Sequence, residues 1–168
     1  MNGKEIYEKI KHIPEDSSFW PDNIDTVYML ASQLPVWSSV LEIGTWYWRS
    51  ASAWALSTGW RVTALDICER THKIAQDFMD DLELNVHMIL WDSHDIEIEE
   101  DFDIVWIDWD HSYESCMNDL ITFFPRARLL ICWHDYHSSW PWVIKAVDEF
   151  FWLKEIKKDW NIWYYFKK

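Results

Sequence analysis

The residue that this sequence lacks most is glycine. It contains only 3 glycines, whereas it contains 15 tryptophans. Average usage would give roughly 12 glycines in a chain of this length. The combined number of glycines and tryptophans is much less unusual than either number alone. We therefore expect the positions of the tryptophans to be more informative than their number.

Positive charge is also scarce. Lysine and arginine number 15 against 29 aspartate and glutamate residues, which gives a formal net charge of −14. Nucleic acids and anionic membrane surfaces are bound through Lys and Arg side chains that neutralise phosphates. We therefore expect no nucleic-acid partner and no membrane partner, and we favour a small or neutral molecule as the ligand.

Cysteines and long apolar runs are few. The three cysteines, Cys68, Cys116 and Cys132, match neither a zinc-binding spacing nor a disulfide framework, so we predict reduced, buried thiols. The N-terminal segment 1–11 has no apolar stretch as long as a signal peptide or a membrane span, and we therefore expect a cytoplasmic protein. A length of 168 residues is enough for one compact domain and too short for two.

Short apolar runs alternate with helical patterns from residue 39 onward, which predicts an α/β fold with a parallel sheet. A near-continuous apolar run such as 104–107 is typical of a strand covered by helices on both faces. The predicted strands are 39–43, 61–66, 85–90, 102–108 and 128–133. The predicted helices in this region are 49–57, 71–81, 114–124 and 142–153.

Each predicted strand ends at a polar or acidic residue. In an open parallel sheet, ligands bind beyond the carboxyl ends of the strands, at the point where the strand order reverses. Five such ends are hard to attribute to solvated loops alone. The residues at these ends are Glu42 to Thr45, Asp66, Asp92 with Ser93, Asp108 to His111, and His134 with Asp135.

The segment 40–45, Val-Leu-Glu-Ile-Gly-Thr, resembles the first motif of class I S-adenosylmethionine-dependent methyltransferases, which runs Glu-x-Gly-x-Gly-x-Gly. Gly44 matches the first glycine of this motif, and Trp46 and Trp48 stand at the other two glycine positions. The resemblance implies a Rossmann-like methyltransferase fold: a mostly parallel seven-stranded sheet with helices on both faces and a C-terminal β-hairpin. It also implies S-adenosylmethionine as the cofactor.

The same resemblance assigns cofactor-binding roles along the chain. Asp66 closes the second strand, where the family's acidic residue holds the ribose hydroxyls, and a carboxylate can accept from both. Asp92 matches the aspartate that lies near the adenine amine; for both residues, capping of the next helix is the alternative. The residues assigned to the cofactor are Glu42, Gly44, Thr45, Trp46, Trp48, Asp66, Ile67, Asp92, Ser93 and Asp108. Within the single domain 1–168 we expect cover helices in 1–36, a cofactor-binding core in 37–153 and a terminal hairpin in 154–168.

The segments 107–114, 132–136 and 141–150 resemble a subfamily of these enzymes whose pattern is Ile-Asp-Gly-x-His-x-Tyr-Glu, then His-Asp, then Pro-Gly-Val. In related small-molecule and sugar O-methyltransferases, the matching aspartates hold a divalent metal. The resemblance thus implies Mg²⁺ between Asp108 and Asp135, where it would lower the pKa of a substrate hydroxyl.

His111, with Asp110 as the alternate, is the predicted catalytic base, because an imidazole titrates near neutral pH. Structural hydrogen bonding of Asp108 and Asp135 to loop amides, without a metal, is an equally open interpretation. For His134 we expect a neutral ring that satisfies backbone groups.

The tryptophans follow the glycine positions of the family. Trp46, Trp48, Trp91 and Trp109 replace motif glycines, and Trp37, Trp133, Trp142 and Trp152 also stand where a turn or the family pattern favours glycine. Glycine is needed in the first loop because the backbone must turn tightly and approach the cofactor. We hypothesise that the gene's code reads UGA as glycine and that the sequence was translated with a table that reads UGA as tryptophan. UGG codons at positions 46, 48, 91 and 109 would refute this hypothesis. Trp20, Trp60, Trp140 and Trp160 have no such pattern, and we expect them to be genuine.

Two further function classes compete with an O-methyltransferase acting on a small molecule or sugar. One is a catalytically inactive Rossmann-like binding module whose pocket is filled by aromatic side chains. The other, weaker one is a metal-dependent hydrolase built on Asp108, His111, His134 and Asp135. The sequence determines neither the acceptor nor the oligomeric state.

Overall fold

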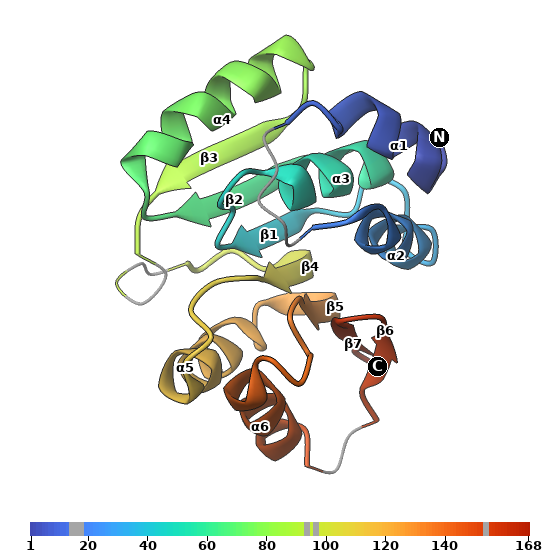
Figure 1. Cartoon of the computed structure of the whole chain (residues 1–168). Coiled ribbons are helices and arrows are strands. Elements are labelled where there is room, and N and C mark those ends of the chain that lie inside the picture. The colour runs from blue at the N-terminus through green and yellow to red at the C-terminus, as the bar shows by residue number, and fades with distance from the viewer. Residues whose placement is uncertain (14–18, 93–94, 96–97, 153–154) are drawn as a thin grey trace.

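The computed structural model describes residues 1–13, 19–92, 95, 98–152 and 155–168 (Figure 1). The strands are β1 (Val40–Ile43), β2 (Val62–Asp66), β3 (Val86–Leu90), β4 (Phe102–Ile107), β5 (Ala127–Trp133), β6 (Lys157–Asp159) and β7 (Ile162–Phe166). The helices are α1 (Gly3–Ile10), α2 (Pro21–Ala31), α3 (Arg49–Thr58), α4 (Glu69–Asp81), α5 (Tyr113–Phe123) and α6 (Pro141–Phe150). The predicted strands and helices are therefore present, with ends that differ by a few residues.

The seven strands form one sheet in the order β3-β2-β1-β4-β5-β7-β6. The five strands from β3 to β5 are parallel, while β7 runs antiparallel to β5 and pairs with β6 as a hairpin. This confirms the predicted fold, including its terminal hairpin. The chain moves outward from β1 to β3 and then returns to place β4 on the other side of β1, so the strand order reverses between β1 and β4. The carboxyl ends of these two strands therefore flank the expected ligand crevice.

Helices cover both faces of this sheet (Figure 1). Side chains of α1, α2, α3 and α4 pack against one face, and side chains of α5 and α6 pack against the other. Strand β1 serves both layers because its residues alternate: Val40 belongs to the first cluster, whereas Leu41 and Ile43 belong to the second. Among the described residues, no helix has both the length and the apolar character needed to cross a bilayer.

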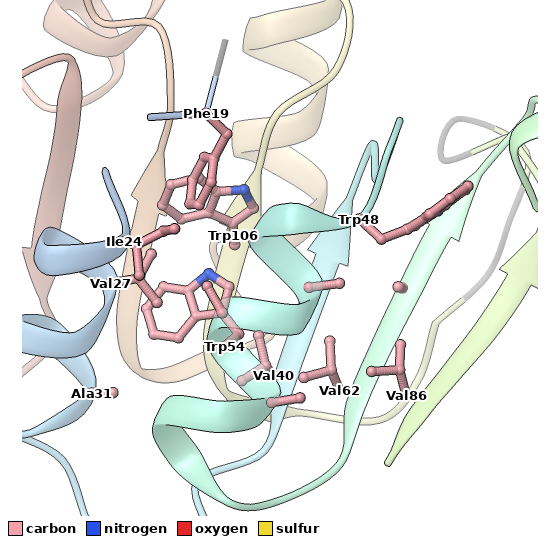
Figure 2. Close-up of a cluster of buried hydrophobic side chains, with 14 of the residues drawn as sticks. Phe19, Ile24, Val27, Ala31, Val40, Trp48, Trp54, Val62, Val86 and Trp106 are labelled. Atoms are coloured by element: carbon pink, nitrogen blue, oxygen red, sulfur yellow. The ribbon is translucent and has the colours of Figure 1, made fainter. Parts of the chain in front are cut away.

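Large aromatic side chains fill the layer between α2, α3 and the sheet. Figure 2 shows Trp54 of α3 beside Trp106 of β4, with Phe19 on the far side of Trp106. The ring centroids of Trp54 and Trp106 lie 5.8 Å apart in an edge-to-face arrangement. The indole nitrogens of Trp48, Trp54, Trp106, Trp133 and Trp163 are buried without a hydrogen-bond partner among the described residues. A buried donor left unpaired costs about 1–3 kcal/mol, so these indoles fill volume at an energetic cost.

Tryptophan also occupies backbone conformations that favour glycine. Among the described residues, the non-glycine residues with positive φ are Trp37, Trp46, Trp48 and Trp160, together with Glu83 and Asp135. A left-handed backbone costs a residue with a side chain about 1–2 kcal/mol. Three of these tryptophans belong to the positions where the family pattern or a turn favours glycine. Trp160, which we expected to be genuine, has φ 54° in the turn between β6 and β7 and so joins them.

Candidate functional site

A cavity of about 650 Å³ lies beyond the carboxyl ends of the parallel strands. Its walls come from the loop after β1, the ends of β2, β3 and β4, and the loop after β5. The predicted cofactor residues that line it are Gly44, Thr45, Trp46, Trp48, Ile67, Asp92 and Asp108. The predicted catalytic and metal-binding residues Asp110, His111 and Asp135 line it as well. The structure therefore brings most of the predicted site residues to one cavity.

Gly44 lets the ends of β1 and β4 approach closely. Its φ is +80°, and a Cβ at this position would collide with the backbone carbonyl of Asp108. The amide of Asp108 in turn donates to the carbonyl of Ile43, 2.8 Å away, which holds the two strand ends together. A side chain at position 44 would therefore push apart the two strands that carry the cavity.

We expect Gly44→Ala to lower the free energy of unfolding by about 2–5 kcal/mol, the sum of the left-handed backbone cost and the cost of overpacking. Gly59→Ala is the matched control, because Gly59 also has positive φ, +67°, but its nearest neighbour would be Trp37 Cζ3 at 3.9 Å. Only the backbone cost of about 1–2 kcal/mol applies there. Urea denaturation of both variants measures the difference, and equal losses would contradict the collision.

The loop between β1 and α3 carries the two tryptophans of the motif. Trp46 has φ 40° and is 45% exposed, whereas Trp48 has φ 58° and its indole is fully buried. Trp48 precedes the first residue of α3, and its amide donates to the carbonyl of Thr45, 2.7 Å away. Both residues thus hold glycine-like conformations at the wall of the cavity.

Glu42 lies behind this loop and not in the cavity wall. Its side chain is fully buried and accepts a hydrogen bond from the hydroxyl of Ser50 in the first turn of α3. Burial raises the pKa of Glu42 well above its usual range, which favours the neutral acid. Glu42 therefore attaches α3 to β1 through Ser50, which does line the cavity, and its predicted contact with the cofactor stays a prediction.

Asp66 does not reach the main cavity. Its carboxylate accepts hydrogen bonds from the amides of Thr45, Trp46 and Cys68, at 3.2, 2.7 and 2.7 Å. Burial raises its pKa, and these amides oppose that rise. A hollow of only about 10 Å³ lies beside it, walled in part by Trp91 and Trp109. The carboxylate is therefore engaged by the loop, and its predicted contact with ribose hydroxyls stays a prediction. Ser93 lies outside the described residues.

Two carboxylates and an imidazole gather at the other end of the cavity. Asp108, His111 and Asp135 each offer one ligand atom within 4.8 Å of the others. His111 Nε2 lies 2.9 Å from Asp135 Oδ2, and the His111 ring stacks on Trp140 with centroids 4.2 Å apart. Burial opposes ionisation of Asp135, but His111 and His134 hold its pKa well below its usual range. Two anionic oxygens beside an imidazole nitrogen suit a divalent cation, so the donor set fits the implied metal.

The backbone of Asp135 is itself strained, with φ 59°. Asp is among the few residues that tolerate this conformation. Such outliers persist where the surrounding structure fixes them. Here, the amide of Tyr136 donates to the carbonyl of Asn161 at 2.8 Å and the amide of His137 donates to the carbonyl of Asp135 at 2.7 Å. The terminal hairpin therefore helps to hold Asp135 in place.

Asp110 is hydrogen-bonded to the start of α5, and its predicted role as the alternate base stays a prediction. Its carboxylate accepts from the amide and hydroxyl of Ser112 and from the hydroxyl of Ser115 at the start of α5. These hydrogen bonds, the Ser112 amide foremost, lower its pKa. These hydrogen bonds indicate that Asp110 attaches the start of α5 to the loop after β4. Of the two candidate bases, His111 is therefore the better placed.

The sequence analysis missed several residues of the cavity wall: Phe19, Tyr47, Arg49, Ser115 and Trp140. The clearest case is Arg49, which is 5% exposed and donates to the carbonyls of Lys11, Ile13 and Phe19 in the N-terminal segment. It therefore ties this segment to the start of α3. The sequence shows an arginine at the start of a predicted helix, but it does not show that this arginine is buried or which carbonyls it contacts.

Solved structures with the same fold include three methyltransferases. The SAM-dependent O-methyltransferase of Thermotoga maritima has TM-score 0.74 and 14% identity, covering 92% of this chain and 59% of its own. The SAH-bound methyltransferase PaMTH1 of Podospora anserina has TM-score 0.71 and 14% identity, covering 99% and 88%. The tRNA (m1A58) methyltransferase TrmI of Aquifex aeolicus has TM-score 0.69 and 19% identity, covering 85% and 57%. The chain thus spans less than two thirds of the length of two of these proteins, and identities this low show the fold alone.

Comparison of the sequence itself gives the family. No curated protein sequence matches the chain. A family model described as a methyltransferase domain matches residues 41–136, which is more than half of the chain and runs from β1 to the residue after Asp135. The matched segment contains the cofactor loop and the cluster of Asp108, His111 and Asp135. The chain belongs to the class I S-adenosylmethionine-dependent methyltransferase family.

Proposed function

We propose that this chain transfers the methyl group of S-adenosylmethionine to a hydroxyl oxygen of a small molecule or sugar, and that a divalent cation assists. The observation that supports this is the arrangement of the cavity. The loop after β1 forms one wall, and the cluster of Asp108, His111 and Asp135 forms another. Cofactor and acceptor groups can therefore meet in one cavity. The net charge of −14 favours such an acceptor over an RNA.

His111 is the residue that we propose to accept the proton of the acceptor hydroxyl. The oxygen would attack the sulfonium methyl as the methyl–sulfur bond breaks, leaving a methyl ether, S-adenosylhomocysteine and the proton on His111. The Asp135 carboxylate, 2.9 Å from His111 Nε2, would stabilise the resulting imidazolium. Stacking on Trp140 fixes the plane of the ring.

Asp108 and Asp135 would hold the cation, and His111 beside them would keep its role as the base. When bound, a cation such as Mg²⁺ would supply positive charge that lowers the pKa of the acceptor hydroxyl. The two carboxylates lie close together at this wall of the cavity, where their negative charge would attract a divalent cation.

A catalytically inactive binding module is the second candidate function. The observation that favours it is the pair of left-handed tryptophans, Trp46 and Trp48, in the loop that should approach the cofactor. Such a module would retain the fold and the cavity without methyl transfer.

The acceptor class is tested with S-adenosylmethionine carrying an isotopic label in its methyl group. The chain with glycine at positions 46, 48, 91 and 109 would be incubated with catechols, sugars and amines, with Mg²⁺ or with EDTA. We expect label in the hydroxyl compounds and stimulation by Mg²⁺. Label in amines alone would overturn O-methylation, and equal rates with EDTA would overturn the role of the metal.

A further inference from the structure

We infer that Trp140 is a specificity-determining residue, and that the acceptor it selects is a flat, uncharged aromatic ring that carries the reacting hydroxyl. This inference rests on the proposed function, because it names the class of molecule that would receive the methyl group. The observations behind it are the aromatic side chains of the cavity wall and the hydrogen bonds in which the polar groups of the wall are already engaged.

The wall of the cavity is rich in aromatic rings. Among the described residues that line it, Ile67 is the only aliphatic side chain, whereas the aromatic ones are Phe19, Trp46, Tyr47, Trp48, Trp109 and Trp140. Phe19, Tyr47 and Trp140 are not among the tryptophans at glycine positions, so these three remain if the others are glycines in the native protein. Pockets for small organic molecules are lined mainly by apolar and aromatic side chains with a few placed polar groups.

Trp140 is held beside His111 at the start of α6. Its amide donates to the carbonyl of His137, 2.8 Å away, and its carbonyl accepts from the amide of Ile144 at 3.3 Å. Its indole stacks on the His111 ring, with centroids 4.2 Å apart and 22° between the planes. The residue is still 41% exposed, and it lines the cavity. A ring that packs against the exposed part of this indole therefore has its substituents beside His111.

The charges of the wall disfavour an anionic acceptor. Asp92, Asp108, Asp110 and Asp135 line the cavity, whereas Arg49 is the one lysine or arginine among the described residues of the wall. The Arg49 guanidinium already donates to three backbone carbonyls. A carboxylate on the acceptor would therefore meet charges of its own sign, which opposes binding.

The hydroxyl groups of the wall disfavour a sugar. Each of the three, those of Thr45, Ser50 and Ser115, donates its proton to another group of the protein. A sugar carries hydroxyls around its whole ring and needs donors as well as acceptors near most of them. A phenol or an aromatic diol needs polar partners at one edge only, where the carboxylates of Asp108 and Asp135 can accept its protons. The wall therefore fits an aromatic acceptor better than a sugar.

The test is a titration of three small molecules into the unmodified chain, with EDTA and without cofactor, followed by the indole N–H signals in ¹H–¹⁵N NMR spectra. Catechol is the uncharged aromatic probe. The compound cis-1,2-cyclohexanediol has the same two hydroxyls without an aromatic ring, and 3,4-dihydroxybenzoate adds a carboxylate to the ring. We expect catechol to shift the Trp140 signal and to bind about two- to tenfold more tightly than either of the others, the range that an aromatic contact contributes.

The variants separate Trp140 from the other tryptophans, with affinities measured by saturation transfer to catechol. Trp140→Leu should weaken catechol binding by about two- to tenfold, and Trp140→Phe, which keeps a ring, should restore most of it. Trp60→Leu is the matched control and should leave the affinity unchanged. Trp60 is 43% exposed, contacts the Trp37 ring with centroids 5.4 Å apart, and does not line the cavity.

Unchanged catechol affinity in a folded Trp140→Leu variant, as monitored by circular dichroism, would overturn the inference. So would an equal loss in Trp60→Leu, or absence of catechol binding by the unmodified chain. Binding of cis-1,2-cyclohexanediol as tight as that of catechol would overturn the aromatic acceptor, and tighter binding of 3,4-dihydroxybenzoate would overturn the uncharged one. The measurement needs neither methyl transfer nor a cation. Catechol binding without label transfer would therefore contradict the proposed function alone, and label transfer to sugars without catechol binding would contradict this inference alone.

Discussion

Replacement of Trp46, Trp48, Trp91 and Trp109 together by glycine is expected to raise the affinity for S-adenosylhomocysteine by on the order of 100-fold. Trp46 and Trp48 hold left-handed backbone in the chain without cofactor, so their strain of about 1–2 kcal/mol each lowers the stability of the loop and not its affinity. Both residues line the cavity, where glycine would leave more room for the cofactor. A gain of this size corresponds to about 2.8 kcal/mol of binding free energy.

The other two tryptophans restrict the space beside Asp66. Trp91 and Trp109 wall the hollow of about 10 Å³ beside Asp66, and glycine at both positions would open it toward the carboxylate that the family uses for ribose. Asp66 has the lone pairs to accept from ribose hydroxyls while it keeps its amide contacts. We therefore expect the affinity gain of the fourfold variant to fall when Asp66→Asn is added.

Isothermal titration calorimetry of folded chains is the measurement. The fully buried indole of Trp48 also contributes packing, so a melting temperature would mix a gain from relieved strain with a loss from a new cavity. Trp152→Gly is the control, since this side chain is 80% exposed and does not line the cavity. It should leave the affinity unchanged. Absence of binding by the fourfold variant would favour the inactive module.

The codons give an independent check of the same hypothesis. UGA at positions 46, 48, 91 and 109 would support glycine in the native protein, and UGG would refute it. The structure adds Trp160 to this test, because this residue has φ 54° and lies in the turn between β6 and β7, where glycine is favoured. We therefore expect UGA at position 160 as well, contrary to the interpretation from the sequence.

The fold was predictable because its signals are local and periodic. Apolar runs such as 104–107 mark strands buried on both faces, and the polar residue that follows each run marks a strand end. Parallel strands bring these ends to one edge, which is why Asp108, His111 and Asp135 could be placed together from the sequence. Tryptophan at glycine positions did not obscure this pattern, since strand identity depends on the flanking residues.

The polar contacts behind the site were not predictable. Asn23 and Asn161 are separated by 138 positions, and their hydrogen bond leaves no periodic trace in the sequence. His134 was expected to satisfy backbone groups, yet its neighbours are the side chains of Asn161, Asp108 and Asp135. Asp66 shows the same limit of prediction. Its place at a strand end was correct, but which donors meet its carboxylate depends on how the tryptophan-bearing loop folds.

The double variant Asp108→Asn with Asp135→Asn is expected to weaken binding of Mn²⁺, used as a probe for the divalent site, by at least about 100-fold. Asparagine keeps the shape and one oxygen of each ligand but removes both negative charges, and loss of outer-shell partners alone typically costs about 10–100-fold in metal affinity. Calorimetric titration with Mn²⁺ measures the change, with circular dichroism to monitor the fold.

Asp110→Asn is the matched control for this variant. Asp110 also lines the cavity and is also acidic, but Ser112 and Ser115 occupy its carboxylate. If the divalent site is Asp108 and Asp135, Asp110→Asn retains Mn²⁺ affinity while the double variant loses it. Equal affinities in all three chains would mean that the two aspartates serve only as acceptors for His111 and His134. Hydroxyl activation would then depend on His111 alone, and methyl transfer would proceed unchanged in EDTA.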